Sequence, residues 1–181
     1  MQVRRVLGAV SLYSPAPRAA LAAAEVAALA GAELTVLTVL RDPWELVRPD
    51  EIESLRRTHG GSPASVAAER AGARLKEFAG PAVLSAPTVS YRTAFGWPSV
   101  EIARCAEEIR ADLIVIGRGD EVVQSKEESV TAATLRRSHA PVLVAPLHHR
   151  ICRRIVACVD ERPHAPAVLA ALPVAALSSS L

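Results

Sequence analysis

The sequence predicts an α/β fold, a doubly wound parallel sheet with helices on both faces. Short runs rich in Val, Ile and Leu alternate along the chain with longer segments of helical periodicity, which is the pattern of repeated strand–helix–strand units. The residues are 50% hydrophobic but only 3% aromatic, so we expect an aliphatic, closely packed core. Right-handed crossovers between parallel strands then restrict the strand order to a few arrangements.

The first helix and its two flanking strands have clear limits. "RRVLGAV" (4–10) and "ELTVLTVL" (33–40) are continuous apolar runs, as expected of strands that are buried on both faces. Between them, the Ala-rich stretch 16–32 has Pro17 near its start and Gly31 just past its end, the usual punctuation of a helix. The chain therefore opens with a strand–helix–strand unit.

The next part of the chain predicts a long connection, a helix and a third strand. Residues 41–61 are charged and contain prolines, so we expect an irregular segment with about one helical turn. Residues 62–80 begin with a capping serine and a proline and end in a glycine, which predicts the second helix. The alternating stretch "TVSYRTAFG" (88–96) predicts the third strand.

Two more helices and two more strands complete the pattern. Residues 97–111 predict a helix that Trp97 and Pro98 open by packing and capping. "DLIVIG" (112–117) is the fourth strand and "APVLVAP" (140–146) the fifth, with a helix from Glu127 to Ser138 between them. Ser125 is expected to cap that helix, with Glu128 completing a capping box. The expected buried stripe of the 97–111 helix consists of Val100, Ile102, Cys105, Ala106 and Ile109.

Charge, cysteines and motifs exclude several functions. A formal charge of +2 gives no electrostatic basis for binding nucleic acid or an anionic membrane. The three cysteines form no CxxC pair and no apolar run reaches about 18 residues, so we expect a cytoplasmic protein with reduced thiols, Cys105 among them in the core. There is no P-loop motif, so a kinase or ATPase of that type is not expected. The adjacent His148 and His149 have no acid or cysteine cluster beside them that would complete a metal site. Ser129 and His139 lie at opposite ends of one predicted helix, too far apart to act as a nucleophile and its base. We therefore expect no catalytic and no metal-binding residues.

The start of the chain is repeated near its end. "RRVLGAVS" at 4–11 returns as "RRIVACVD" at 153–160, and Ala-rich sequence follows both copies. One strand and one helix bury too little surface to fold alone. The sequence thus predicts one domain over residues 1–147, and a linker plus the orphan first strand and helix of a second repeat over residues 148–181. The orphan is docked on the first domain, exchanged with a partner, or loose, and the sequence leaves these alternatives open.

Three stretches resemble the universal stress protein family. They are "RRVLGAV…ALAAAEVAALAGAELTVLTVL", "ARCAEEIRADLIVIG" and "SVTAATLRRSHAPVLVAP", and together the resemblance covers residues 3–146. The restart at residue 153 looks like the opening of the second domain of a tandem member. The resemblance implies a Rossmann-like five-stranded parallel sheet and a homodimer that pairs the last strands, here residues 140–146. It also implies two branches, one that binds ATP and one that does not.

The residues that bind ATP in the first branch are only partly present. There, the resemblance implies a phosphate loop of pattern G-x2-G-x9-G-[S/T], an aspartate at the end of the first strand and a valine near the end of the second. Ser11 stands at the aspartate position, and the loop from Gly117 to Ser129 is two residues shorter than the pattern. Asp120 and Glu128 stand where the second and third glycines are expected. The candidate cofactor-binding residues are therefore Ser11, Val39, Ile116, Gly117, Gly119, Ser129, Val130 and Thr131.

The acidic loop favours a protein without a cofactor. Carboxylates close to a phosphate cost about 1 kcal/mol each in water, and more in a partly desolvated cleft. We therefore favour a non-catalytic regulatory module that has a degenerate nucleotide loop and acts through dimer or partner contacts. The alternative is an ATP-binding member, at most a slow ATPase, in which Mg²⁺ bridges Asp120 or Glu128 to the phosphates. A smaller or less anionic adenine compound in the same cleft would be repelled less.

Overall fold

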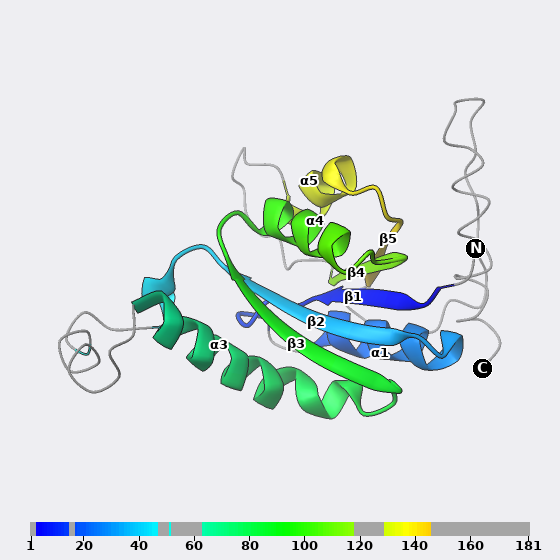
Figure 1. Ribbon diagram of the computed structural model, residues 1–181, viewed down its shortest axis with the longest axis horizontal. Helices are drawn as coiled ribbons and strands as arrows, with labels where there is room; N and C mark the ends of the chain where they lie inside the picture. Colours follow the sequence, from blue (N-terminus) through cyan, green and yellow to red (C-terminus); the bar gives the residue numbers. More distant parts are fainter. Residues whose placement is uncertain (1–2, 15–16, 47–50, 52–62, 118–128, 146–181) are drawn as a thin grey trace.

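Five parallel strands form one sheet in the order β3-β2-β1-β4-β5 (Figure 1). The computed structural model describes residues 3–14, 17–46, 51, 63–117 and 129–145. The predicted α/β class and all five predicted strands are confirmed within this part of the chain. The order reverses between β1 and β4, which is the place where open α/β sheets bind ligands, at the carboxyl ends of the strands. The strands are β1 (Arg5–Ala9), β2 (Glu33–Leu40), β3 (Thr88–Phe95), β4 (Leu113–Gly117) and β5 (Val142–Ala145).

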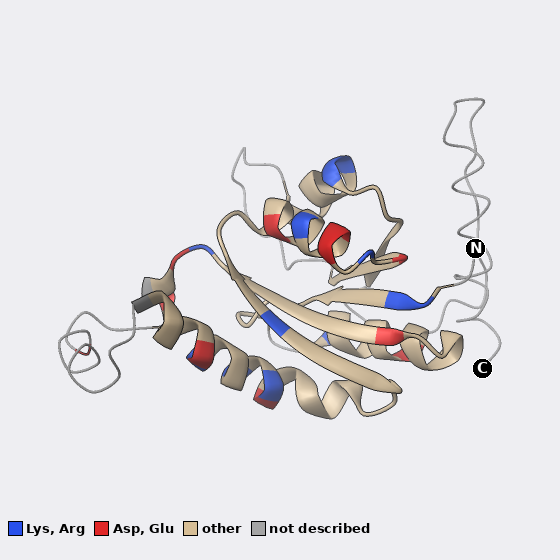
Figure 2. Ribbon diagram, in the orientation of Figure 1, with Lys and Arg blue, Asp and Glu red and all other residues tan. Residues whose placement is uncertain are grey.

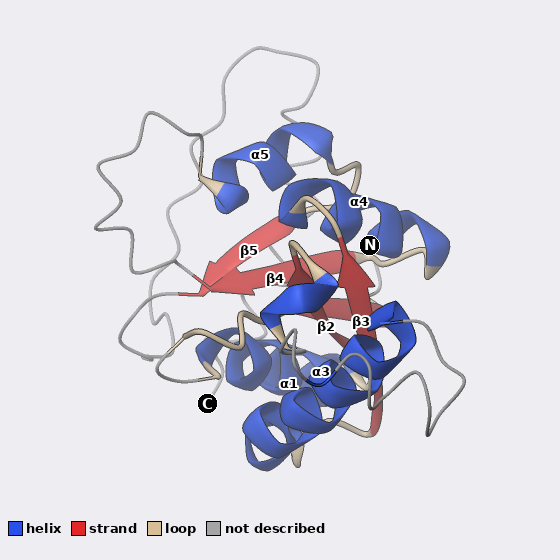
Figure 3. Cartoon of the chain, turned by 90° about the vertical axis from the view of Figure 1, so that its left-hand side faces the viewer, coloured by secondary structure: helices blue, strands red, loops and turns tan. Residues whose placement is uncertain are grey.

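The helices cover both faces of the sheet (Figure 3). α1 (Arg18–Ala30) and α3 (Pro63–Ala79) lie on one face, whereas α4 (Pro98–Glu108) and α5 (Val130–Arg137) lie on the other. Two short 3-10 helices, η1 (Pro43–Glu45) and η2 (Gly80–Val83), follow β2 and α3. η1 forms a short turn in the connection after β2, and most of the rest of that connection lies outside the described residues.

α1 packs on β1 at very short range. A Cβ atom on Gly8 would lie 3.0 Å from the Cβ of Ala23, so glycine on the strand and alanine on the helix together permit this approach. The helix ends at Gly31, whose φ of 62° is left-handed, and the next amide donates back to the carbonyl of Ala27 at 2.8 Å. The predicted role of Gly31 as the residue that ends the helix is confirmed.

The face under α4 and α5 has its own apolar cluster. Ile102, Cys105 and Ala106 of α4 are buried against Leu7 and Ile114 of the sheet. Burial raises the pKa of the Cys105 thiol, although the nearby guanidinium of Arg92 acts in the opposite direction. The prediction of a core thiol is confirmed.

Val100 was expected in the same buried stripe, but that prediction is wrong. The side chain of Val100 is 44% exposed. Val100 lies in the first turn of α4, and the sheet-facing contacts of that helix begin two residues later, at Ile102.

The start of α5 also differs from the prediction. The helix begins at Val130, not Glu127, and its cap is Ser129 instead of Ser125. The Ser129 hydroxyl accepts a hydrogen bond from the amide of Ala132 at 3.1 Å, which fixes the first turn at that point. Its first turn contains no acidic residue, and Ser125 and Glu128 of the predicted capping box lie outside the described residues.

Lys, Arg, Asp and Glu positions recur along α3 and α4, as the colours of the ribbon in Figure 2 mark. On α4, Arg104 contacts both Glu101 and Glu108, and Glu108 also accepts from Arg92 of β3 at 3.1 Å. No helix in the described part of the chain is both long enough and apolar enough to cross a bilayer. Gly119, His148, His149 and residues 148–181 lie outside the described residues, so the domain division stays a prediction.

Candidate functional site

The carboxyl ends of β1, β2, β3 and β4 lie at one end of the sheet, which we call the carboxyl edge. Ser11 and Tyr13 follow β1, Arg41 and Glu45 follow β2, Trp97 follows β3, and Gly117 ends β4. Because parallel strands end at the same side, these residues share one edge although more than 100 positions separate the first from the last. The candidate site lies here.

Three predicted site residues share one apolar cluster beside this edge. Val39 of β2, Ile116 of β4 and Val130 of α5 all belong to the core under α4 and α5. Ile116 is the register partner of Ala9 on β1, so it lies at the point where the strand order reverses. The structure therefore brings these three residues together.

Gly117 and Ser129 flank the loop expected to bind phosphate. A Cβ atom on Gly117 would lie 3.6 Å from the Cβ of Ala19 on α1, an ordinary contact distance. Ser129 caps α5, and Thr131 is half-buried in its first turn. The loop itself, including Gly119, lies outside the described residues, so its geometry stays untested.

Ser11 provides a turn at the end of β1. It is exposed, and its hydroxyl accepts a hydrogen bond from the amide of Tyr13 at 3.3 Å. A serine in this arrangement stabilises a tight turn and offers no negative charge to a ligand. Ser11 therefore does not reproduce a carboxylate at the predicted aspartate position.

A fixed tyrosine–carboxylate pair links the β1 and β2 connections. The Tyr13 hydroxyl donates to Glu45 Oε2 at 2.5 Å, and the amide of Asp42 donates to Glu45 Oε1 at 2.9 Å. Partial desolvation and the bond to Glu45 raise the pKa of Tyr13 to about 12. Desolvation alone would raise the pKa of Glu45, but the donors Tyr13, Asp42 and Arg41 and the charge of Arg41 outweigh it and lower that pKa. Glu45 is thus an ionised acceptor that is held in place.

Trp97 is exposed at the carboxyl edge, next to Arg41. The indole is 65% exposed, and the guanidinium carbon of Arg41 lies 4.8 Å from its ring centroid. Trp97 occupies the N-cap position of α4, yet its side chain makes no capping hydrogen bond. The prediction that Trp97 packs and caps is therefore wrong for the side chain, because the ring lies on the surface and Pro98 begins the helix.

Sequence reasoning missed Tyr13, Arg41 and Glu45. All three lie in irregular connections, where no periodicity marks a side chain as pointing toward a site. The available signal was positional, because Arg41 comes immediately after one predicted strand end, Tyr13 comes three residues after another, and Glu45 follows Arg41 within about one turn.

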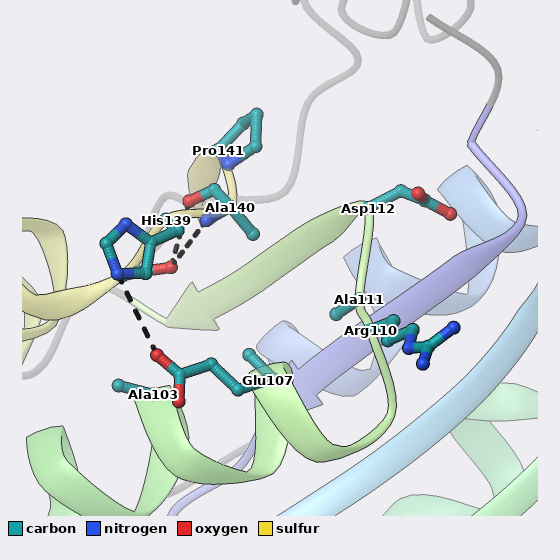
Figure 4. Close-up of a pocket in the computed structure, with 10 residues that line it drawn as sticks. Ala103, Glu107, Arg110, Ala111, Asp112, His139, Ala140 and Pro141 are labelled. Atoms are coloured by element: carbon teal, nitrogen blue, oxygen red, sulfur yellow. Dashed lines mark hydrogen bonds and ion pairs between the residues drawn. The ribbon is translucent and has the colours of Figure 1, made fainter.

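A surface cavity of about 300 Å³ lies at the opposite end of the sheet (Figure 4). It is bounded by α4, by the connection into β4 and by the connection from α5 to β5. Glu107 and His139 point toward one another at its rim, with 3.9 Å between Oε1 and Nε2, and their side chains are 62% and 90% exposed. None of the predicted site residues lines this cavity, and its walls include the alanines Ala103, Ala106, Ala111 and Ala140.

Among the described residues, no group of three or more His, Cys, Asp or Glu side chains is placed to hold a metal ion. The described side chains of the carboxyl edge provide hydroxyl, carboxylate, guanidinium and indole groups.

Comparison with known proteins gives the family. The model of the universal stress protein family matches residues 2–146, and the chain belongs to this family. Its fold is similar to that of a universal stress protein solved in complex with cAMP, with 23% identity, a TM-score of 0.55, and 82% of this chain and 100% of that chain covered. UspA from Lactobacillus plantarum is 23% identical with a TM-score of 0.54 (80% and 99% covered), and the hypothetical protein MJ0577 is 20% identical with a TM-score of 0.57 (83% and 100% covered). These likenesses show the fold, and no curated protein matches the chain.

Proposed function

We propose that this universal stress protein is a non-catalytic, cytoplasmic regulatory module that acts through pairing of β5 with a second copy of the chain. One observation carries the proposal. β5 is the last strand of the sheet, and within the described residues only β4 pairs with it. Val144 on this strand is 37% exposed, and Val142 and Leu143 are only partly buried. An apolar edge strand of this kind favours self-association, and a two-fold dimer is the commonest outcome.

The proposal is tested by measuring the mass of the protein in solution by light scattering. We expect the wild-type chain to have the mass of two copies, and Val144→Lys to weaken the association at least about tenfold, because a lysine on an edge strand opposes pairing. Val100→Lys is the matched control, since Val100 is also an exposed valine but lies on α4. A monomeric wild-type chain would contradict the proposal. It would favour the alternative that the sequence also allows, in which the orphan strand of residues 153–159 takes the place of a partner at this edge.

A second candidate function is the binding of an adenine nucleotide at the carboxyl edge. It is favoured by the N-terminal turn of α5, which begins at this edge without an acidic residue and so suits an anion. The similar protein solved with cAMP supports an adenine compound of low charge. ATP with Mg²⁺ remains the more highly charged alternative, and the acids of the loop oppose it.

This candidate is tested by thermal unfolding with cAMP, AMP, ADP or ATP and Mg²⁺. A ligand at 100 times its Kd stabilises the folded state by about 2.7 kcal/mol, which raises the melting temperature by about 5–10 °C. We expect a rise with cAMP or AMP that exceeds the rise with ATP, and its loss in Gly117→Asp. Gly80→Asp is the control, because Gly80 begins η2 just after the C-terminal end of α3. Equal melting temperatures with and without every nucleotide would exclude the candidate.

A further inference from the structure

We propose that Glu45, held by Tyr13, accepts a hydrogen bond from the ribose 2′-hydroxyl of a nucleotide at the carboxyl edge. The inference rests on the second candidate function, the binding of an adenine nucleotide, and names the residues that recognise the sugar. It assigns a role to the hydrogen-bonded pair Tyr13–Glu45, which belongs to neither the phosphate loop nor the apolar cluster around Ile116.

The first argument is that the carboxylate expected at the end of β1 is absent. Ser11 occupies that position and uses its hydroxyl for the turn to Tyr13. Two carboxylates follow β2, those of Asp42 and Glu45, and it is Glu45 that the Tyr13 hydroxyl ties to the β1 connection. An acid at the end of the second strand is also where dinucleotide-binding sheets recognise the ribose 2′-hydroxyl.

The second argument is the number of acceptor positions that Glu45 retains. Each carboxylate oxygen can accept two hydrogen bonds. Oε2 accepts one from Tyr13 and Oε1 accepts one from the amide of Asp42. The backbone of Arg41 also donates to this carboxylate, so three of its four acceptor positions are used and one is left for a ligand hydroxyl. The Tyr13 hydroxyl, which donates to Glu45, can in addition accept from the ligand.

The third argument is that the pair is both accessible and fixed in advance. Glu45 is exposed and the Tyr13 ring is 63% exposed, so a ligand can reach them. The two hydrogen bonds restrict the Glu45 side chain before a ligand arrives, which lowers the entropy lost on binding. The pair Glu107–His139 at the other end of the sheet has a 3.9 Å separation and lacks this restraint.

The test is calorimetric titration of the full chain with adenosine 5′-monophosphate and with its 2′-deoxy counterpart. We expect the wild-type protein to bind the ribonucleotide about tenfold more tightly, the usual effect of one hydrogen bond to a charged group. In Glu45→Gln this ratio should fall to about one to threefold, because the amide has lost one acceptor and the charge. In Tyr13→Phe the ratio should fall to an intermediate value, since Glu45 stays charged but is less well held.

The ratio of the two affinities separates recognition of the sugar from a general loss of structure, because a loss of structure weakens the binding of both nucleotides equally. Glu107→Gln is the matched control and should keep the wild-type ratio. A wild-type ratio near one, or a tenfold ratio that persists in Glu45→Gln, would overturn the inference while leaving nucleotide binding in place. Failure of the wild-type chain to bind either nucleotide would overturn both the inference and the second candidate function.

Discussion

The two faces of the sheet are rich in alanine, yet they pack differently. Under α1 the strand position opposite the helix is Gly8, and Ala23 lies so close that an added Cβ would be 3.0 Å away. Around α4 and the connection to β5 alanine meets alanine, and a cavity of about 300 Å³ remains between Ala103, Ala106 and Ala140. Small side chains therefore give tight packing only where the opposing strand residue is also small enough for the backbones to approach.

This difference bears on where function resides. The tight face anchors the ends of β1 and β4, because both Gly8 and Gly117 contact α1. These are the two strands between which the sheet order reverses. The looser face holds the cavity, whose polar rim groups are mostly exposed. The candidate site thus lies where the backbone is held firmly and the polar groups are bonded to one another, not where the surface is most hollow.

The largest expected effect comes from adding three carbon atoms to each face. We expect Gly8→Val to lower the free energy of unfolding by about 2–3 kcal/mol, because α1 must move away from β1. Ala103→Leu also adds three carbons but extends into the cavity, so it should stay within about 0.5 kcal/mol of the wild type. Urea unfolding at neutral pH measures both. Equal losses for the two variants would show that the faces do not differ in packing.

The comparison also explains how far the sequence could predict the structure. The strands and the ends of α1 were predictable, because Val-, Leu- and Ile-rich runs and the Pro17–Gly31 punctuation depend on local chemistry. The start of α5 was not, since Ser125 and Ser129 are both suitable caps and only the packing of Val130 in the core selects the second. The Tyr13–Glu45 pair joins two irregular connections 32 residues apart, and no periodic pattern reports such a contact.

A smaller effect is expected at the C-terminal ends of α1 and α4, which lie on opposite faces of the sheet. α1 is followed by Gly31 at φ 62°, and α4 by Arg110 at φ 52°, just after its C-cap Ile109. The amides of Ala32 and Ala111 donate back to the carbonyls of Ala27 and Ala106, at 2.8 Å in each case. We expect Gly31→Ala to cost about 1 kcal/mol, because a side chain disfavours the left-handed conformation.

Arg110→Gly makes the reverse change on the other face. It should raise the free energy of unfolding by about 0.5–1 kcal/mol, since it removes the same conformational cost. Thermal unfolding of the two variants beside the wild type measures both effects. A destabilised Arg110→Gly would mean that the arginine side chain contributes more at the cavity than its backbone conformation costs.

The smallest effect concerns the Tyr13–Glu45 pair at the carboxyl edge. The folded state lowers the pKa of Glu45, so the stability that the pair contributes is present at neutral pH and is lost as the pH falls through the folded pKa. Tyr13→Phe should therefore cost about 0.5 kcal/mol at pH 7, a value that allows for the solvent exposure of both groups, and less near pH 3.

At alkaline pH the dependence has the opposite sign, because the contribution of Tyr13 to stability is lost as the pH rises. Because the folded state raises the pKa of Tyr13 to about 12, its contribution is complete below the ordinary tyrosine value of 10 and disappears as the pH rises toward 12. Urea unfolding of the wild type and Tyr13→Phe between pH 3 and 12 measures the difference between their free energies of unfolding, with Tyr91→Phe on β3 as the control. If this difference does not become smaller in acid, the partners of Glu45 do not keep its carboxyl group ionised. The carboxyl edge would then lack the fixed negative charge that distinguishes it from the rim of the cavity.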